Sequence, residues 1–268
     1  ASALSGQVFL SSDDDGHVAV VTLSHAPKFN AMSRAMWREL AEVFGRVQAS
    51  DAWRCVLLQG EGGHFCAGGD IAEYPDFRFD AAQLRAFHED DVWGGLSAML
   101  DCDVPIVAAI AGNCMGAGME IASCCDIRVA ADDAKFGAPI AKLGFPMAPR
   151  EAQLVARVAG ELTAREMLLA AGVLEAAEMK SRGFLHRVLA ADALHAHALE
   201  RAARIASLAP GAARLNKQTF RALKTAPALE GQAQAAIKNI VSTAYDYADS
   251  AEHREGIDAF LAKRPARF

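Results

Sequence analysis

Two glycine-rich stretches constrain this chain more than any other feature, because each directly follows a short apolar run. The first, GGHFCAGGD at residues 62–70, comes after residues 55–59, and the second, AGNCMGAGME at 111–120, comes after residues 104–110. Glycine is entropically costly, so such clusters mark turns with positive φ or a backbone that must approach another group closely. A loose surface loop is the competing interpretation of either stretch alone. Together they predict two strand ends that present backbone amides.

The gross composition is that of an ordinary globular protein. The 268 residues are 52% hydrophobic and 22% charged, which is enough apolar material for a large core. The net charge of −6, with acids and bases interspersed, provides no basic stripe for a phosphate backbone. No segment approaches the roughly 20 apolar residues of a membrane span, and the first residues lack the pattern of a signal peptide. We therefore expect no nucleic-acid partner, no membrane insertion and a cytoplasmic location.

The six cysteines carry no metal or disulfide signature. They form no CxxC pair and have no histidine partners at zinc spacing. We expect buried, reduced thiols, as is usual for a cytoplasmic protein, and no metal site.

The order of apolar patterns predicts an α/β architecture. Short β-like runs alternate with helical patterns, as in residues 18–23, 34–48 and 54–58. From about residue 192 the β signals stop and helical patterns continue to about residue 261. We expect this helical end to pack on the core or on another subunit.

Several familiar glycine-rich sites do not fit the second stretch. A helix that begins there would present unpaired N–H groups, which suit an anion or a developing oxyanion. A dinucleotide-binding fingerprint would need glycine or alanine at Ile121, and a P-loop would need Gly-Lys-Ser or Gly-Lys-Thr. The chain also has no Gly-x-Ser-x-Gly segment, which argues against a serine hydrolase of that type.

The paired motifs FCAGGDI and AGNCMGAGMEIASCCDIRVA resemble the crotonase superfamily, also called the enoyl-CoA hydratase/isomerase family. Four further segments resemble that family in the same order: TLSHAPKFNAMS, KFGAPIAKLGFP, AAEMKSRGFLHRVL and EGIDAFLAKRPARF. The resemblance implies an α/β fold in which a crotonase-like spiral of ββα units with the acyl-CoA site spans residues 1–190. It implies a C-terminal helical trimerisation region over residues 191–268.

The resemblance also gives the two glycine-rich loops a role. In this family each loop provides one backbone N–H to an oxyanion hole, and the matching positions here are Gly69 and Ala117. Such a hole is needed because deprotonation next to a thioester, or addition to its conjugated alkene, places negative charge on the carbonyl oxygen. Alanine can replace glycine at position 117 if φ is negative, as it is at the start of a helix.

The acid–base residues depart from the family pattern. Glu120 matches the first of the two glutamates of the hydratases and lies three residues beyond Ala117, on the same helix face. A capping or dipole role is the alternative for a glutamate at a helix start. The second glutamate should follow the proline of F-G-x-P, where this chain has Ile140, and a related position used by some isomerases falls on Ala148. Neither side chain can carry a proton, so the second acid of syn hydration is missing there.

Three other places could supply an acid or base. The segment FHEDDVW at residues 87–93 should wall the acyl pocket and either points one polar side chain inward or presents a solvated face. Glu73 and Tyr74 stand where some members that act on aromatic acyl-CoA esters place a tyrosine for a phenolic substrate, although packing at a loop rim is the alternative. His64 precedes the first loop and is a further candidate base.

The resemblance implies CoA contacts from both ends of the chain. A lysine beside a 3′-phosphate is a strongly hydrated cation that meets a dianion, although Lys263 could also be a solvated tail charge. The matching positions are Lys28, Phe29, Ala67, Asp70, Ile71, Phe260 and Lys263. The last two often reach the nucleotide from a neighbouring subunit.

The sequence thus predicts an acyl-CoA enzyme of the hydratase/isomerase type, in which Glu120 is the acid–base residue. A crotonase-like hydrolase or decarboxylase, and a catalytically degraded CoA-binding subunit, are the alternatives that Ile140 leaves open. We expect an acyl-CoA thioester as the substrate, with coenzyme A as part of it and no other cofactor. We also expect a homotrimer or a dimer of trimers.

Overall fold

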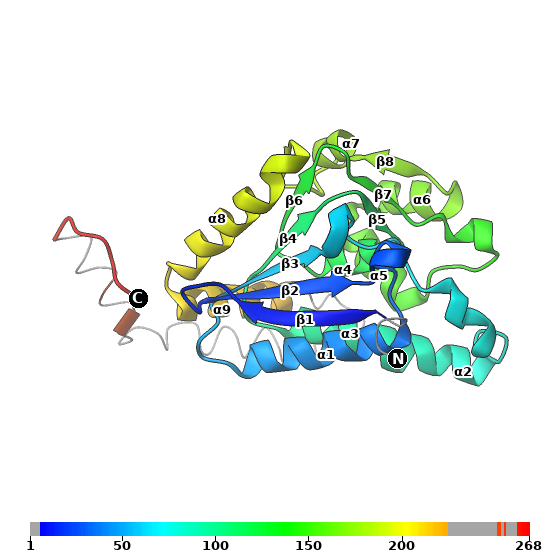
Figure 1. Ribbon diagram of the computed structural model, residues 1–268, viewed down its shortest axis with the longest axis horizontal. Helices are drawn as coiled ribbons and strands as arrows, with labels where there is room; N and C mark the ends of the chain where they lie inside the picture. Colours follow the sequence, from blue (N-terminus) through cyan, green and yellow to red (C-terminus); the bar gives the residue numbers. More distant parts are fainter. Residues whose placement is uncertain (1–5, 225–250, 253–254, 256–261) are drawn as a thin grey trace.

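The computed structural model describes residues 6–224, 251–252, 255 and 262–268, and a six-stranded sheet lies at its centre (Figure 1). The strands run in the order β1-β2-β3-β4-β6-β9. β1 is antiparallel to β2, and all other neighbours are parallel. The bounds are β1 (Gln7–Ser12), β2 (Val18–Ser24), β3 (Cys55–Gly60), β4 (Ile106–Ile110), β6 (Ile127–Ala131) and β9 (Arg187–Leu189).

A second, three-stranded sheet accompanies the first. It contains β5 (Asn113–Met115), β7 (Lys135–Gly137) and β8 (Val173–Glu175) in that order. β5 follows β4 and leads into α4 (Ala117–Ser123), while β7 follows β6 and leads towards α5 (Pro149–Ala159) and α6 (Glu161–Leu169). Two strands and then a helix therefore recur along the chain, as the predicted spiral of ββα units requires.

The central sheet is covered by helices on both faces because its strands are apolar on both sides. On β3, Val56 and Leu58 point to one face and join the core with α1 (Arg34–Ala49) and α3 (Trp93–Asp101). Cys55 and Leu57 point to the other face, as alternation along a strand demands. There they meet α8 (Leu194–Ala206), whose buried residues are Leu194, Ala198, Ala202 and Ala206.

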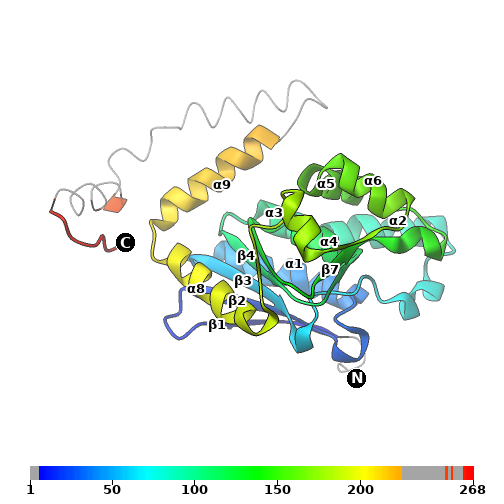
Figure 2. The same cartoon turned by 90° about the horizontal axis from the view of Figure 1, so that it is seen from above.

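The remaining helical elements connect these layers. They are η2 (Ala26–Lys28), η3 (Glu61–Gly63), η4 (Ile71–Asp76), α2 (Ala81–Ala86), the π-helix η5 (Phe87–Val92), η6 (Pro139–Leu143), α7 (Ala176–Ser181), η7 (Ala191–Ala193) and α9 (Pro210–Lys224). After β9 the described elements are helices, and α9 stands away from the sheet in the view from above (Figure 2). α8 lies beyond residue 190 but shares a core with the central sheet, so the packing of the described residues does not mark a domain boundary there. The boundary at residue 190 stays a prediction. None of the helices in the described ranges is long and apolar enough to cross a membrane.

All six cysteines lie in described segments, and all are buried free thiols, as predicted. Burial raises the pKa of the Cys66 thiol to about 12, so the reactive thiolate is suppressed. They act as small core side chains.

Candidate active site

The two glycine-rich loops lie side by side at one edge of the sheet. β3 and β4 are parallel neighbours, so the segments that follow them leave the same edge. The loops then bond to each other: the Cys66 N–H donates to the Asn113 oxygen over 2.9 Å, and the Met115 N–H donates to the Cys66 oxygen over 2.9 Å. A second short bridge joins Met32 to Gly69. The chain thus positions both loops by backbone hydrogen bonds.

The backbone amide of Gly69 is turned away from these bonds. Met32 donates its N–H to the Gly68 oxygen over 2.8 Å and accepts from the Asp70 N–H over 2.9 Å. In this parallel pattern the N–H of the residue between them points to the other side, towards a cavity that Gly69 lines. A Cβ at position 69 would collide with the Tyr74 hydroxyl. A side chain at position 69 would therefore require Tyr74 or the loop to move.

Ala117 is the first residue of α4, where the N–H has no partner within the helix. Gly116, the N-cap, adopts φ 49 and ψ −108, a conformation open to glycine. The turn is held because the Gly116 N–H donates to the Gly137 oxygen over 2.8 Å. Ala117 is not among the non-glycine residues with positive φ, so an alanine fits, as the sequence predicts.

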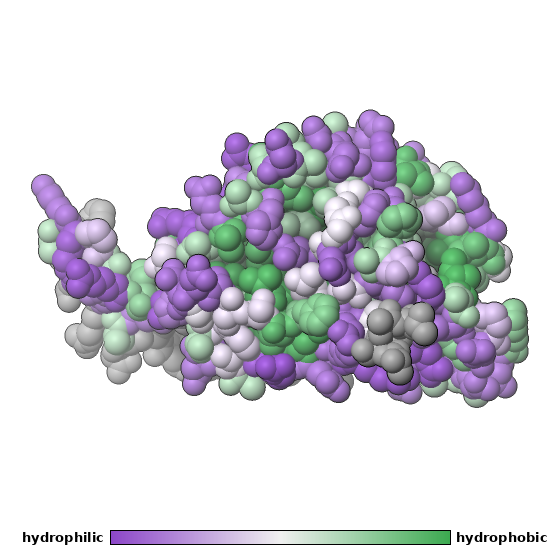
Figure 3. Space-filling model, in the orientation of Figure 1, coloured by the Kyte–Doolittle hydropathy of each residue, from purple (hydrophilic) through white to green (hydrophobic). Residues whose placement is uncertain are grey.

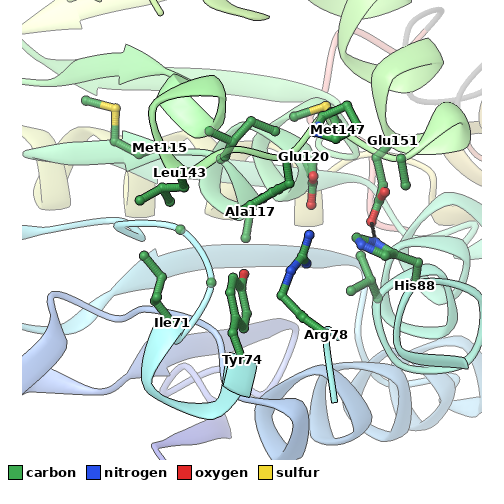
Figure 4. A pocket seen from close by; sticks show the side chains of 18 of the residues that line it. Ile71, Tyr74, Arg78, His88, Met115, Ala117, Glu120, Leu143, Met147 and Glu151 are labelled. Carbon is green, nitrogen blue, oxygen red and sulfur yellow. Dashed lines mark hydrogen bonds and ion pairs between the residues drawn. The ribbon is translucent and has the colours of Figure 1, made fainter. Parts of the chain in front are cut away.

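Gly69 and Ala117 both line one mainly apolar cavity of about 330 Å³, which Figure 4 shows from close by. Trp37, Phe87 and Val92 contribute apolar wall, and Ile140 and Ala148 line the cavity without a titratable group. The polar side chains on its wall are Tyr74, Arg78, His88, Glu120, Lys142 and Glu151. In Figure 4, Ile71 and Leu143 lie at one side, His88 and Glu151 at the other, and Glu120 and Arg78 between them.

Glu120 lies in the first turn of α4 and is 8% exposed. Glu120 and Ala117 line the same cavity. Burial, and then the nearby charge of Glu151, raise the pKa of Glu120 well above its usual range. Both effects favour a protonated carboxyl group.

Two further titratable side chains, His88 and Glu151, meet at the cavity, and only the segment that holds His88 was named from the sequence. His88 on η5 lies with its Nδ1 atom 2.9 Å from Oε1 of Glu151 on α5. Glu151 is 2% exposed, and its other oxygen, Oε2, is a buried atom without a hydrogen-bond partner. The segment 87–93 therefore points its imidazole inward. Asp91 in the same segment is buried against Arg34 and Arg38 instead of facing solvent.

The sequence holds a signal for Glu151 that the family pattern obscures. The buried residues of α5 are Glu151, Leu154, Val155 and Ala159, so the glutamate occupies an apolar stripe of helical spacing. It lies three residues beyond Ala148, one turn from the position at which an acid is expected. A glutamate on a core-facing stripe is rarely buried without a partner.

The aromatic and cationic side chains near the first loop enclose the cavity further. The Arg78 guanidinium lies 3.9 Å from the ring centroid of Phe145 and 4.7 Å from that of Tyr74. Burial raises the pKa of Tyr74 to about 12, so its hydroxyl stays protonated and can donate. Glu73, by contrast, accepts a hydrogen bond from the Arg34 N–H over 2.9 Å and does not line the cavity.

His64 is not part of the cavity wall. Its Nδ1 accepts a hydrogen bond from the Asn113 N–H over 3.0 Å, and its ring lies 4.5 Å from that of Phe29. The imidazole thus connects the two loops through the Asn113 backbone, and His64 does not line the cavity that contains Gly69 and Ala117.

Five of the predicted CoA contacts come together around the first loop. Ala67 and Ile71 line the cavity, and the side chain of Phe29 is exposed. Lys28 Nζ lies 2.7 and 2.8 Å from the two carboxylate oxygens of Asp70. Asp70 is 4% exposed and also caps η4. Its carboxylate therefore has a structural role, in which it positions the Lys28 ammonium group.

The other two predicted contacts are not part of this group. Phe260 lies outside the described residues, and Lys263 is exposed and does not line the cavity. In the described part of the chain, no three His, Cys, Asp or Glu side chains gather as metal ligands would. The CoA roles stay predictions.

Comparison with known proteins agrees with this geometry. The family model for enoyl-CoA hydratase/isomerase matches residues 13–268. The chain is 30% identical over 254 residues to a probable enoyl-CoA hydratase of Mycobacterium bovis, covering 95% of both chains, and 31% identical over 209 residues to a short-chain-enoyl-CoA hydratase of Clostridium acetobutylicum, covering 78% and 79%. A solved enoyl-CoA hydratase/carnithine racemase of Magnetospirillum magneticum superimposes with a TM-score of 0.88 at 36% identity, covering 97% of each chain. The fold is therefore the crotonase fold, and the chain belongs to the enoyl-CoA hydratase/isomerase family.

Proposed function

We propose that the chain is an acyl-CoA enzyme that stabilises a thioester enolate between the amides of Gly69 and Ala117, with Glu120 as an acid–base residue. The observation that carries this proposal is the meeting of three groups in one cavity: two backbone N–H groups turned away from backbone acceptors, and a buried carboxyl group. The names of the relatives support a thioester substrate.

The chemistry follows from where charge develops. Removal of a proton at C2, or addition of a nucleophile at C3 of a conjugated thioester, moves negative charge to the carbonyl oxygen. Two fixed donors in an apolar cavity offset several kcal/mol of that cost, on the order of 3 kcal/mol for each donor. Glu120, near Ala117, then exchanges a proton with the carbon skeleton. Because its pKa is raised, the carboxyl can act as an acid as well as a base.

In the bound thioester, the CoA portion is proposed to extend out of the cavity past Ala67 and Ile71, beside Phe29 and the Lys28–Asp70 ion pair. These residues surround the first loop, and two of them line the cavity. Phe260 and Lys263 would contact the nucleotide from a neighbouring subunit of a trimer or a dimer of trimers. We keep the cytoplasmic location as a prediction.

A substrate panel tests the proposal. Saturated, 2-enoyl, 3-enoyl and malonyl-type thioesters are incubated with the protein and with Glu120→Gln, and products are identified by mass. Turnover on the best substrate should fall about 10²- to 10⁴-fold in Glu120→Gln, because the amide keeps the shape but cannot exchange a proton. Binding of the CoA ester should change little. Unchanged turnover in the variant would refute the role of Glu120, and release of free CoA or of CO₂ would favour the hydrolase or decarboxylase alternatives.

A further inference from the structure

The His88–Glu151 pair has the arrangement of an oriented base. One ring nitrogen of His88, Nδ1, lies 2.9 Å from the buried carboxylate of Glu151. The imidazole is 23% exposed and lines the cavity. Its one hydrogen bond in the described part of the chain is that of Nδ1, and Nε2 is not a buried atom without a partner. The Nε2 atom is therefore the part of the pair that remains accessible to a ligand.

Resting on the proposed function, we propose that His88, held by Glu151, is the second acid–base group of this site and takes the water proton when the site hydrates a 2-enoyl thioester. His88 would contact the water, so it is a catalytic residue. Glu151 would act through His88, so it is a positioning residue.

Glu151 decides which ring nitrogen carries the proton. A carboxylate can only accept, so Nδ1 donates to it and the neutral ring keeps its lone pair on Nε2. The same carboxylate stabilises the imidazolium that forms when Nε2 takes a proton, which is the role of the acid in a hydrolase triad. A buried carboxylate with one unpartnered oxygen is costly, and its pairing with a single imidazole indicates a functional use more than a structural one.

The charges around the cavity leave Glu120 able to donate a proton and His88 able to accept one. From the other elements packed around the cavity, Tyr74, Arg78 and Glu120 face it, with Lys142 on the wall formed by η6. The charge of Asp91 is neutralised by Arg34 and Arg38. Glu89 does not line the cavity, and its carboxylate lies 3.3 Å from the Arg150 guanidinium. Burial and the Glu151 charge favour a protonated Glu120. One group is then poised to donate a proton and the other to accept one.

The addition balances with these two groups and the oxyanion hole. A water proton passes to His88 Nε2 while the water oxygen bonds to C3. The C2=C3 electron pair shifts to form the enolate, whose oxygen is held by Gly69 and Ala117. The enolate then takes the Glu120 proton at C2, which gives a 3-hydroxyacyl thioester. Proton exchange between imidazolium, carboxylate and solvent resets the site without an oxidant or reductant.

Two reactions separate this inference from the proposed function. Hydration of a short 2-enoyl-CoA needs both groups, whereas exchange of the C2 protons of a saturated acyl-CoA in deuterium oxide needs only the oxyanion hole and the carboxylate form of Glu120, which takes the proton and returns a deuteron from solvent. The native protein should catalyse both. In His88→Gln, kcat for hydration should fall about 10²- to 10⁴-fold while C2 exchange and KM are retained. Glu151→Gln should shift the same ratio in the same direction by a smaller factor.

Glu89→Gln is the matched control. It breaks an ion pair between the same two elements, η5 and α5, outside the cavity, and both reactions should proceed at native rates. Retained C2 exchange also shows that the His88 and Glu151 variants are folded.

The possible results are distinct. Native hydration rates in His88→Gln and Glu151→Gln would overturn the inference, as would equal loss of hydration and exchange in both variants. A native protein that exchanges C2 protons but adds no water would overturn it while leaving the proposed function in place. A native protein that does neither would overturn both.

Discussion

Gly69 serves both the geometry of the first loop and the proposed chemistry. Its amide is free because the bonds to Met32 use the residues on either side of it. Its missing side chain leaves room for Tyr74, whose hydroxyl fills the space that a Cβ would occupy. A side chain at this position would therefore disturb the proposed oxyanion donor even though the donor is backbone.

Replacing Gly69 by alanine tests this. The added methyl must displace Tyr74 or the loop, so kcat on the best thioester should fall at least about 10-fold, while the affinity for free CoA is retained. Gly94→Ala on α3 is the control, since a Cβ at that position meets nothing within 4 Å. Its activity should be native, and its helix somewhat more stable. Native turnover in Gly69→Ala would show that the loop tolerates a side chain and that the donor lies elsewhere.

The raised pKa of Glu120 has a cost in stability that depends on pH. A carboxyl group with a higher pKa in the folded state than in the unfolded state binds more protons when folded. The free energy of unfolding therefore falls as the pH rises above the pKa that Glu120 has in the unfolded state, by up to about 1.4 kcal/mol per pH unit. Glu120→Gln should melt at a higher temperature than the native protein at pH 8 and with little difference at pH 4. Thermal unfolding followed by circular dichroism checks this, and a gain of equal size at both pH values would contradict it.

At the scale of elements, the strands and loops could be predicted because their signals are local. Residues 55–59 and 104–110 are apolar runs that end in glycine-rich turns, and β3 and β4 cover most of them. The placement of His88 could not be predicted in the same way. Residues 87–92 form a π-helix, so a polar face estimated at 3.6 residues per turn does not give the true direction of each side chain.

Glu151 shows the other limit of sequence reasoning. Matching to the family pattern directs attention to Ile140 and Ala148, and both do line the cavity. In this chain a buried carboxyl group, that of Glu151, lies one helical turn further along, on the buried stripe of α5. A shift of one turn keeps a side chain on the same helix face, so a carboxyl group can reach the same cavity from either position. A sequence motif compares fixed positions and misses such a shift. The places of Gly69 and Ala117 in the two loops follow the motifs more directly, because backbone geometry and not side-chain identity fixes them.

At the scale of the whole molecule, one chain leaves considerable apolar surface uncovered. Apolar residues appear at the surface of the face drawn in Figure 3, and Phe9 on β1 is 50% exposed. On α9, Phe220 and Leu223 are each 62% exposed. The polar side of that helix is fixed to the core by Lys217 and Arg221, which pair with Asp126 and Asp103. The helix is thus positioned by ion pairs, while apolar side chains remain available to a further surface.

We expect that surface to be another copy of the chain, in a trimer or a dimer of trimers. Burial of a large apolar side chain contributes roughly 1.5 to 3 kcal/mol, so three copies of this patch favour association at micromolar concentration. Sedimentation velocity should give three or six times the mass of one chain. Phe220→Ser should shift the distribution towards smaller species, whereas Phe9→Ser, on the edge strand β1 and not on α9, should leave it unchanged. A native monomer at micromolar concentration would contradict the expectation. It would also leave Lys263 without a neighbouring site to complete, because within one chain it does not line the cavity.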